Sequence, residues 1–177
     1  MVHNFRATEF QAAILQGQLA NLDALMEIYN RNAARLEDRL RDVAGVRVQS
    51  RGRLSSRQSY YAFTVVWDEE PLADVSLPLI HEALGAEGFS MGGTYGVVYQ
   101  HILFNVAKDK YRVEPSPVAE KIGAGRTSVA LHMVLGADDK SIELIGEAIA
   151  KVAGNTDALR AHANHLAQNT TSEIVPE

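Results

Sequence analysis

The sequence contains no cysteine, which excludes disulfide bonds, thiolate metal sites and cysteine nucleophiles. It also has no apolar stretch near the roughly 20 residues of a membrane span, and its polar N-terminus lacks the apolar region of a signal peptide. The net charge is −5 and no long basic run is present, which disfavours nucleic acid as a partner. These absences predict a cytoplasmic protein that binds neither nucleic acid nor membranes.

The residues that are present have ordinary globular proportions. The chain has 177 residues, of which 46% are hydrophobic and 22% are charged. A chain of this length can bury about 70% of the surface that it exposes when unfolded. We expect a single domain over residues 1–168 and a disordered tail over residues 169–177.

A long helix is predicted in the N-terminal quarter of the chain. Apolar residues recur at intervals of three and four from Phe10 to Val43. Thr8 and Gln11 form a capping-box pattern at its start, and Gly45 is the expected C-cap. The predicted length exceeds the globular average, so a bend or two abutting helices is an alternative, with the break at Asn21 and Asp23.

The rest of the chain alternates between predicted strands and helices. We expect strands at residues 46–50, 59–67, 89–95 and 127–135, with an irregular segment at 96–116. Helices are expected at residues 74–86, 117–122, 138–152 and 155–166. This order predicts an α+β fold, in which the long N-terminal helix joins a small, largely antiparallel sheet with helices packed on one side.

The residues just before the long helix are a candidate anion site. Asn4 and Arg6 lie two residues apart where free backbone N–H groups and the helix dipole favour negative charge. An ordinary capped helix start with a surface arginine is the alternative.

Three other groups of polar residues have weaker functional interpretations. His162 and His165 are spaced as a metal pair on a predicted helix, but no third ligand is evident, so a solvated helix is favoured. His132 lies among apolar residues of a predicted strand, where a hydrogen-bonded core or interface histidine is favoured over a catalytic base. Three arginines form a basic loop for which solvation is favoured over phosphate binding: Arg51, Arg53 and Arg57.

Several segments resemble one enzyme family. Residues 3–13, HNFRATEFQAA, resemble the Asn-x-Arg-Met-(Ser/Thr)-(Glu/Asp)-(Phe/Ile)-Gln-Ala-Ala motif of the DegT/DnrJ/StrS aminotransferases, with Ala7 at the usual Met position. Four later segments are similar to other patterns of that family: residues 32–36, 59–63, 87–99 and 117–120. The resemblance covers roughly residues 3–153 and corresponds to the C-terminal portion of a family member.

The resemblance implies a fold, a cofactor and roles for particular residues. The family's enzymes are fold type I homodimers that use pyridoxal phosphate (PLP) to aminate keto-sugars and ketocyclitols. By this resemblance, Asn4 is expected to contact the PLP phosphate of the neighbouring subunit, with Arg6 supporting the same region or pairing within its own chain. Tyr95 and Tyr99 are expected near the substrate entrance of the partner subunit.

The residues needed for transamination are missing from this pattern. A PLP aminotransferase requires a lysine that forms the Schiff base, and in the family this lysine precedes the motif at residues 3–13. None of the five lysines occurs in the family's context for that residue: Lys108, Lys110, Lys121, Lys140 and Lys151. The chain is therefore expected to be inactive alone and to contact PLP only in complex with a missing large domain.

Three hypotheses follow. The first is a C-terminal portion of a sugar or cyclitol aminotransferase, which contributes the dimer interface, the PLP-phosphate contact and closure over the substrate. The second is a stand-alone interaction module that pairs with itself or with a full-length aminotransferase. The third is a small-molecule-binding α+β domain unrelated to transaminases.

Overall fold

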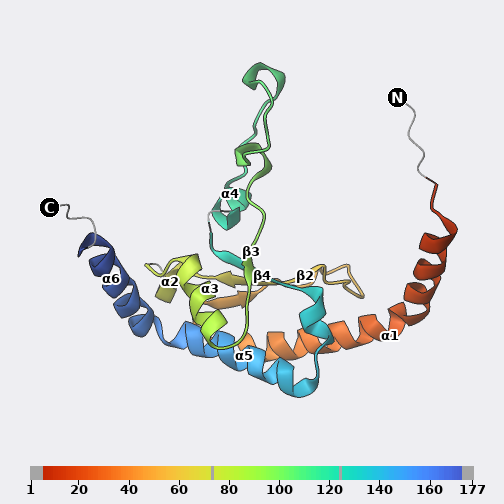
Figure 1. The fold of residues 1–177 in the computed structure, drawn as a ribbon, viewed down its shortest axis with the longest axis horizontal. Helices are drawn as coiled ribbons and strands as arrows, with labels where there is room; N and C mark the ends of the chain where they lie inside the picture. The colour runs from red at the N-terminus through yellow and green to blue at the C-terminus, as the bar shows by residue number, and fades with distance from the viewer. Residues whose placement is uncertain (1–5, 73, 124, 173–177) are drawn as a thin grey trace.

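The computed structural model describes residues 6–72, 74–123 and 125–172, and Figure 1 shows their arrangement. A small antiparallel sheet has helices packed against one of its faces. An irregular arm projects from the other face (Figure 1). The α+β class expected from the sequence is confirmed.

Helix α1 (Glu9–Leu40) is continuous, although it curves along its length (Figure 1). Its N-cap is Thr8, and the predicted capping box with Gln11 is present. Gln11 N–H donates to Thr8 Oγ1 at 3.3 Å, while Thr8 N–H donates to Gln11 Oε1 at 2.8 Å. These two bonds satisfy backbone donors that the first turn of a helix leaves free.

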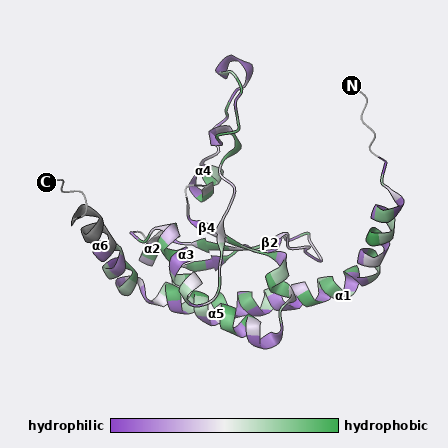
Figure 2. Cartoon of the chain, viewed as in Figure 1, coloured by the Kyte–Doolittle hydropathy of each residue, from purple (hydrophilic) through white to green (hydrophobic). Residues whose placement is uncertain are grey.

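Only the second half of α1 is buried in the core. Its buried residues lie on one helical face from Met26 to Leu40. The same face continues towards the N-terminus as an apolar stripe that no described element covers. We call these residues the α1 stripe: Phe10, Ile14, Leu15, Leu19, Leu22 and Leu25. The N-terminal half of α1 therefore extends beyond the rest of the described domain (Figures 1 and 2).

The sheet has the strand order β1-β2-β4-β3, and each neighbouring pair is antiparallel. Its strands are β1 (Val46–Val48), β2 (Ala62–Trp67), β3 (Gly92–Gly93) and β4 (Thr127–Leu131). Phe63, Val65 and Trp67 alternate along β2 and are buried against the helices. Thr64 and Val66 point to the opposite face, which we call the open face, and are half-buried there.

The helices of the core face pack around α5 (Asp139–Gly154) and α3 (Leu77–Ala86). Asp138 is the N-cap of α5 and accepts from Ser141 N–H at 2.8 Å. Helix α6 (Thr156–Ser172) follows α5 and contacts α3. Two short helices lie elsewhere: α2 (Glu69–Leu72) follows β2, and α4 (Pro117–Gly123) lies over the open face at the base of the arm (Figure 1).

A 3-10 segment, η3 (His132–Gly136), follows β4 and is held against α1 by one buried side chain. Asn32 is 0% exposed, and its amide nitrogen donates to Leu135 O at 2.8 Å and to Ala137 O at 3.0 Å. A single side chain thus satisfies two backbone carbonyls that lie outside regular structure.

Several predicted strand boundaries were wrong. The strand expected at 127–135 ends at Leu131, because the chain turns there into η3. The strand expected at 59–67 begins at Ala62, because Tyr60 adopts a left-handed backbone conformation with φ 49°. The strand expected at 89–95 is reduced to Gly92–Gly93.

The long helix was also predicted to extend too far. It ends at Leu40 with Arg41 as its C-cap, and Gly45 instead occupies a later turn with φ 78°. Helix α2 was not predicted. The described part of the predicted tail is the end of α6, and residues 173–177 lie outside the described residues.

Within the described ranges, no helix combines the length and the apolar character needed to cross a membrane.

Candidate functional site

The two tyrosines predicted to lie near substrate belong to the segment that follows β3. Tyr95 lies two residues after β3 and is 83% exposed, and its hydroxyl is 3.5 Å from the hydroxyl of Tyr61 at the start of β2. Tyr99 lies in the 3-10 turn η1 (Val98–Gln100) and is half-buried. Its hydroxyl donates to Glu120 Oε1 of α4, which raises the pKa of Tyr99.

These contacts give the two tyrosines different surroundings. Tyr95 pairs with another aromatic residue over the open face, whereas Tyr99 joins the arm to α4. The arm itself continues away from the sheet (Figure 1), where Phe104 and Tyr111 pack edge to face with ring centres 5.0 Å apart.

Tyr61 and Tyr95 border a cleft of about 510 Å³ on the open face. We call it the tyrosine cleft. Its polar lining consists only of neutral amide and hydroxyl side chains, and its remaining lining is apolar or glycine: Gln49, Gln58, Ser59, Tyr60, Tyr61, Ala62, Thr64, Gly93, Thr94, Tyr95, Val129 and Leu131. A cleft of this volume is within the usual range for small-molecule sites.

Sequence reasoning missed the tyrosine cleft. Tyr61 had been assigned to a strand with no role, and no spacing in the sequence relates it to Tyr95. The available signal was the Tyr60–Tyr61 pair, since successive residues of a regular strand point to opposite faces and one of the two was bound to reach the open face.

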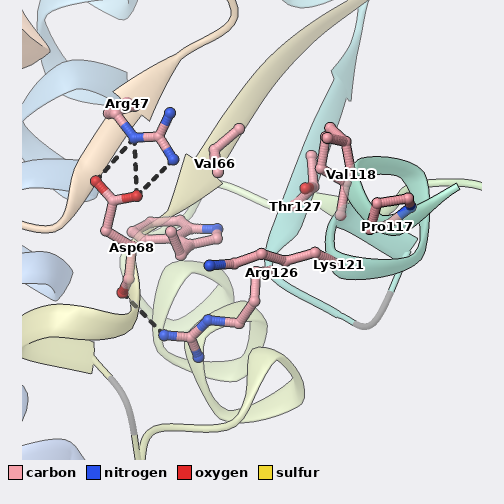
Figure 3. Close-up of a pocket in the computed structure, with 10 residues that line it drawn as sticks. Arg47, Val66, Asp68, Pro117, Val118, Lys121, Arg126 and Thr127 are labelled. Carbon is pink, nitrogen blue, oxygen red and sulfur yellow. Dashed lines mark hydrogen bonds and ion pairs between the residues drawn. The ribbon is translucent and has the colours of Figure 1, made fainter.

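A second cleft, of about 600 Å³, lies between α4 and the other end of the open face (Figure 3). We call it the α4 cleft. Its lining includes Arg47, Asp68, Lys121, Arg126 and Thr127, together with apolar residues of β2 and α4.

Most charged groups of the α4 cleft are engaged within the protein. Arg47 Nε donates to both carboxylate oxygens of Asp68 at 2.8 Å, and this bond lowers the pKa of Asp68. The side chain of Lys121 reaches across the cleft towards that pair (Figure 3), and its charge lowers the same pKa further. Arg126 donates to three backbone oxygens, those of Asp68, Leu72 and Val75, at 2.8–3.1 Å.

Two polar atoms beside this cleft have no hydrogen-bond partner among the described residues, Arg126 Nε and Thr127 Oγ1. Both are sealed from solvent, so a ligand in the cleft does not reach them. The arrangement is that of a structural clamp, in which Arg126 fixes the backbone around α2.

The predicted anion site is only partly described. Asn4 lies outside the described residues. Arg6 is exposed and precedes the capping box of α1. The prediction that Asn4 and Arg6 bind phosphate therefore stays a prediction.

The histidines and the basic loop make contacts with other side chains of the protein. His132 lies in η3 rather than in a strand, and it is exposed beside Tyr29, with ring centres 6.0 Å apart. His162 is 3.4 Å from Glu82. No group of three potential metal ligands occurs among the described residues. In the basic loop, Arg57 pairs with Asp23 at 2.6 Å.

His81 belongs to a hydrogen-bonded group in the core. Its Nε2 lies 2.7 Å from Ser128 Oγ, which also accepts from Trp67 Nε1 at 2.8 Å. Burial lowers the pKa of His81, so the neutral ring is favoured in the folded chain.

Comparison with known proteins agrees with the family resemblance seen in the sequence. A family model described as the DegT/DnrJ/EryC1/StrS aminotransferase family matches residues 1–150. An L-glutamine:2-deoxy-scyllo-inosose aminotransferase of Streptomyces paromomycinus is 32% identical over 166 residues, which cover 86% of this chain and 39% of the relative. A protein of the same name from Streptomyces lividus is 34% identical, with 78% and 36% covered.

Solved structures with the same fold include 3-amino-5-hydroxybenzoic acid synthase, with a TM-score of 0.70, 20% identity, and coverage of 85% of this chain and 40% of that one. A Helicobacter pylori aminotransferase involved in the biosynthesis of pseudoaminic acid also has a TM-score of 0.70, with 21% identity and 87% and 39% covered. The chain thus spans about two-fifths of the length of the proteins that it matches. The hypothesis of a domain unrelated to transaminases is wrong.

Proposed function

We propose that this chain, which belongs to the DegT/DnrJ/EryC1/StrS aminotransferase family, is the C-terminal portion of a sugar or cyclitol aminotransferase and is not catalytic alone. The observation that carries the proposal is the match itself, which extends over most of this chain but only about two-fifths of each relative. The uncovered apolar α1 stripe supports it, because the rest of such an enzyme would supply a surface for that stripe.

Aminotransferases of this family depend on PLP, which carries the amino group between donor and acceptor. The described residues do not fit a complete PLP site. All five lysines have exposed side chains, whereas a Schiff-base lysine is activated by desolvation or by a neighbouring charge in a closed site. The lysine must come from the part of the enzyme that this chain does not span.

The parts assigned to this chain are positional. Asn4, supported by Arg6, contacts the PLP phosphate across a homodimer interface. Tyr95 and Tyr99 close over the substrate, since both lie at the root of the arm that projects from the open face. The capping box of α1 supports the role of Arg6, because it fixes the direction in which the preceding residues enter the helix.

A PLP titration followed by absorbance tests the absence of catalysis. We expect the isolated chain to give no saturable aldimine band, and borohydride reduction followed by peptide mass spectrometry to find no stoichiometric adduct at any of the five lysines. Adding the lysine-bearing portion of a relative should restore the band and transamination. A saturable, stoichiometric band on the chain alone would falsify the proposal.

The alternative function is a stand-alone interaction module, and the observation behind it is the exposure of the α1 stripe. Six apolar side chains on one helical face are 36–85% exposed, and such continuous surfaces promote association. The partner would be a second copy or a full-length aminotransferase.

Light scattering after size exclusion tests this alternative. Association through the stripe predicts an oligomer that Ile14→Lys dissociates, while Gln16→Lys, on the opposite side of α1, leaves it intact. A clean monomer at low micromolar concentration counts against the module.

A further inference from the structure

We propose that the tyrosine cleft binds the ring of an uncharged polyhydroxylated substrate, with Tyr61 and Tyr95 against the ring and Thr64 at the floor of the cleft. This rests on the proposed function, and it adds both the surface of this chain that receives substrate and the kind of group that this surface takes.

The lining of the cleft has the chemistry that a neutral polyol requires. Amides and hydroxyls both donate and accept hydrogen bonds, and so do the hydroxyl groups of a sugar or cyclitol. No charged side chain is among the described residues that line the cleft. A phosphate or carboxylate would gain no ion pair there, whereas bound anions in proteins usually have one.

Several of these polar groups remain available to a ligand. Among the described residues, the side chains of Gln49, Thr64 and Thr94 have no hydrogen-bond partner. Thr64 is half-buried on β2 and faces Val129 of β4 across the strand pair, and the apolar side chain of Val129 cannot satisfy its hydroxyl. A ligand hydroxyl at the floor of the cleft would do so.

The aromatic residues provide the second half of ring recognition. Tyr61 and Tyr95 are 70% and 83% exposed, although they come from segments 34 residues apart and meet at their hydroxyls. An aromatic ring offers a flat apolar face for the C–H groups of a saturated ring, and a phenol adds a polar tip for its hydroxyls. Two exposed tyrosines that converge over a largely apolar cleft with several hydroxyl and amide groups therefore fit a saturated, hydroxylated ring.

The nearest cluster of basic side chains lies in a neighbouring pocket and not in the tyrosine cleft itself. Tyr60 also borders a neighbouring pocket that contains Arg51 and Arg53. A nucleotide-linked sugar could place its phosphates there, whereas a free cyclitol would use the tyrosine cleft alone. The two ligand types therefore predict different sets of perturbed residues.

An NMR titration of the isotope-labelled full chain distinguishes these cases. The probes are 2-deoxy-scyllo-inosose, uridine diphosphate and inorganic phosphate. We expect the cyclitol to give saturable shifts at Gln49, Thr64 and Thr94 with a millimolar Kd, and we expect the two anions to leave these residues unchanged.

Variants locate the site. Tyr95→Ala should weaken cyclitol binding by about tenfold, and Thr64→Val by about fivefold, the loss of one hydrogen bond. Two matched controls should leave the Kd unchanged. Thr127→Val makes the same hydroxyl-to-methyl change on the same face of the sheet, and Phe10→Ala removes an equally exposed ring elsewhere.

Three results would overturn the inference: no saturable shift with the cyclitol, cyclitol binding that Tyr95→Ala and Thr64→Val do not weaken, or anions that perturb the cleft as strongly as the cyclitol does. None of them bears on whether the chain is part of an aminotransferase, because the PLP titration and the restoration of activity test that separately.

Discussion

Replacing Asn32 should be among the most destabilising single changes in this chain. Among the described residues, Asn32 is the only residue of α1 whose side chain hydrogen-bonds to the backbone at η3. Its amide donates to Leu135 O and Ala137 O. In Asn32→Ala both carbonyls lose their donor in a region without regular backbone pairing. One lost hydrogen bond costs about 1–2 kcal/mol when a buried partner is left unsatisfied, so we expect a loss of about 2–4 kcal/mol.

The measurement is urea unfolding followed by fluorescence. Trp67 is the single tryptophan and is 1% exposed, so its emission reports loss of the core. For a slope of about 2 kcal/mol per molar urea, the midpoint should fall by about 1–2 M. Asn32→Asp should be worse at neutral pH, because one oxygen would keep the bond from Arg31 Nε while the other faced the same carbonyls without a donor.

Asn21→Ala is the matched control on the same helix. Asn21 is exposed and donates only to Gly17 O, so its replacement should leave stability unchanged or slightly raised by the better helix propensity of alanine. If Asn32→Ala unfolded at the same urea concentration as the parent chain, the two hydrogen bonds would make no net contribution to the free energy of unfolding. Asn32 would then not be what holds η3 against α1.

Three further outcomes follow from local chemistry. Thr127→Val removes a buried hydroxyl without a described partner, so it should raise the free energy of unfolding by about 1 kcal/mol in the same urea assay. Gly45→Ala should lower it by about 2 kcal/mol, since φ is 78° and the new Cβ would lie 2.7 Å from Pro71 Cδ. The lowered pKa of His81 means that its contribution to stability is intact above pH 6.5 and is lost as the pH falls below it, because the unfolded chain takes up the proton first. His81→Gln should therefore weaken the pH dependence of the urea midpoint below pH 6.5.

Local patterns predicted the elements whose stability is mostly local. The start of α1 could be placed from Thr8 and Gln11 because both partners of the capping box lie within one turn. The end of β4 could not, because residues 127–135 form a mostly apolar run without a glycine or proline to mark where the strand stops. What ends the strand is Asn32, which holds η3 from 103 residues earlier in the chain.

The tyrosine cleft was unpredictable for a similar reason. Tyr61 and Tyr95 meet only because β2 and β3 both pair with β4, which sets their distance through the register of two strand pairs. The backbone at Tyr60 also matters, since its positive φ interrupts the extended chain so that β2 begins only at Ala62, after Tyr61. A resemblance in sequence could point to Tyr95, but it contained no information on the residue that faces it.

The size of the α1 stripe bears on the two proposed functions. Its six residues together expose the equivalent of about three to four whole side chains, so covering them would contribute about 7 kcal/mol. A two-fold dimer would bury two such stripes, for about 14 kcal/mol, against an association cost of about 4–15 kcal/mol. A partner domain of the same polypeptide avoids most of that cost. The stripe is therefore sufficient for packing within one enzyme and only marginal for pairing separate chains, which favours the aminotransferase portion over the stand-alone module.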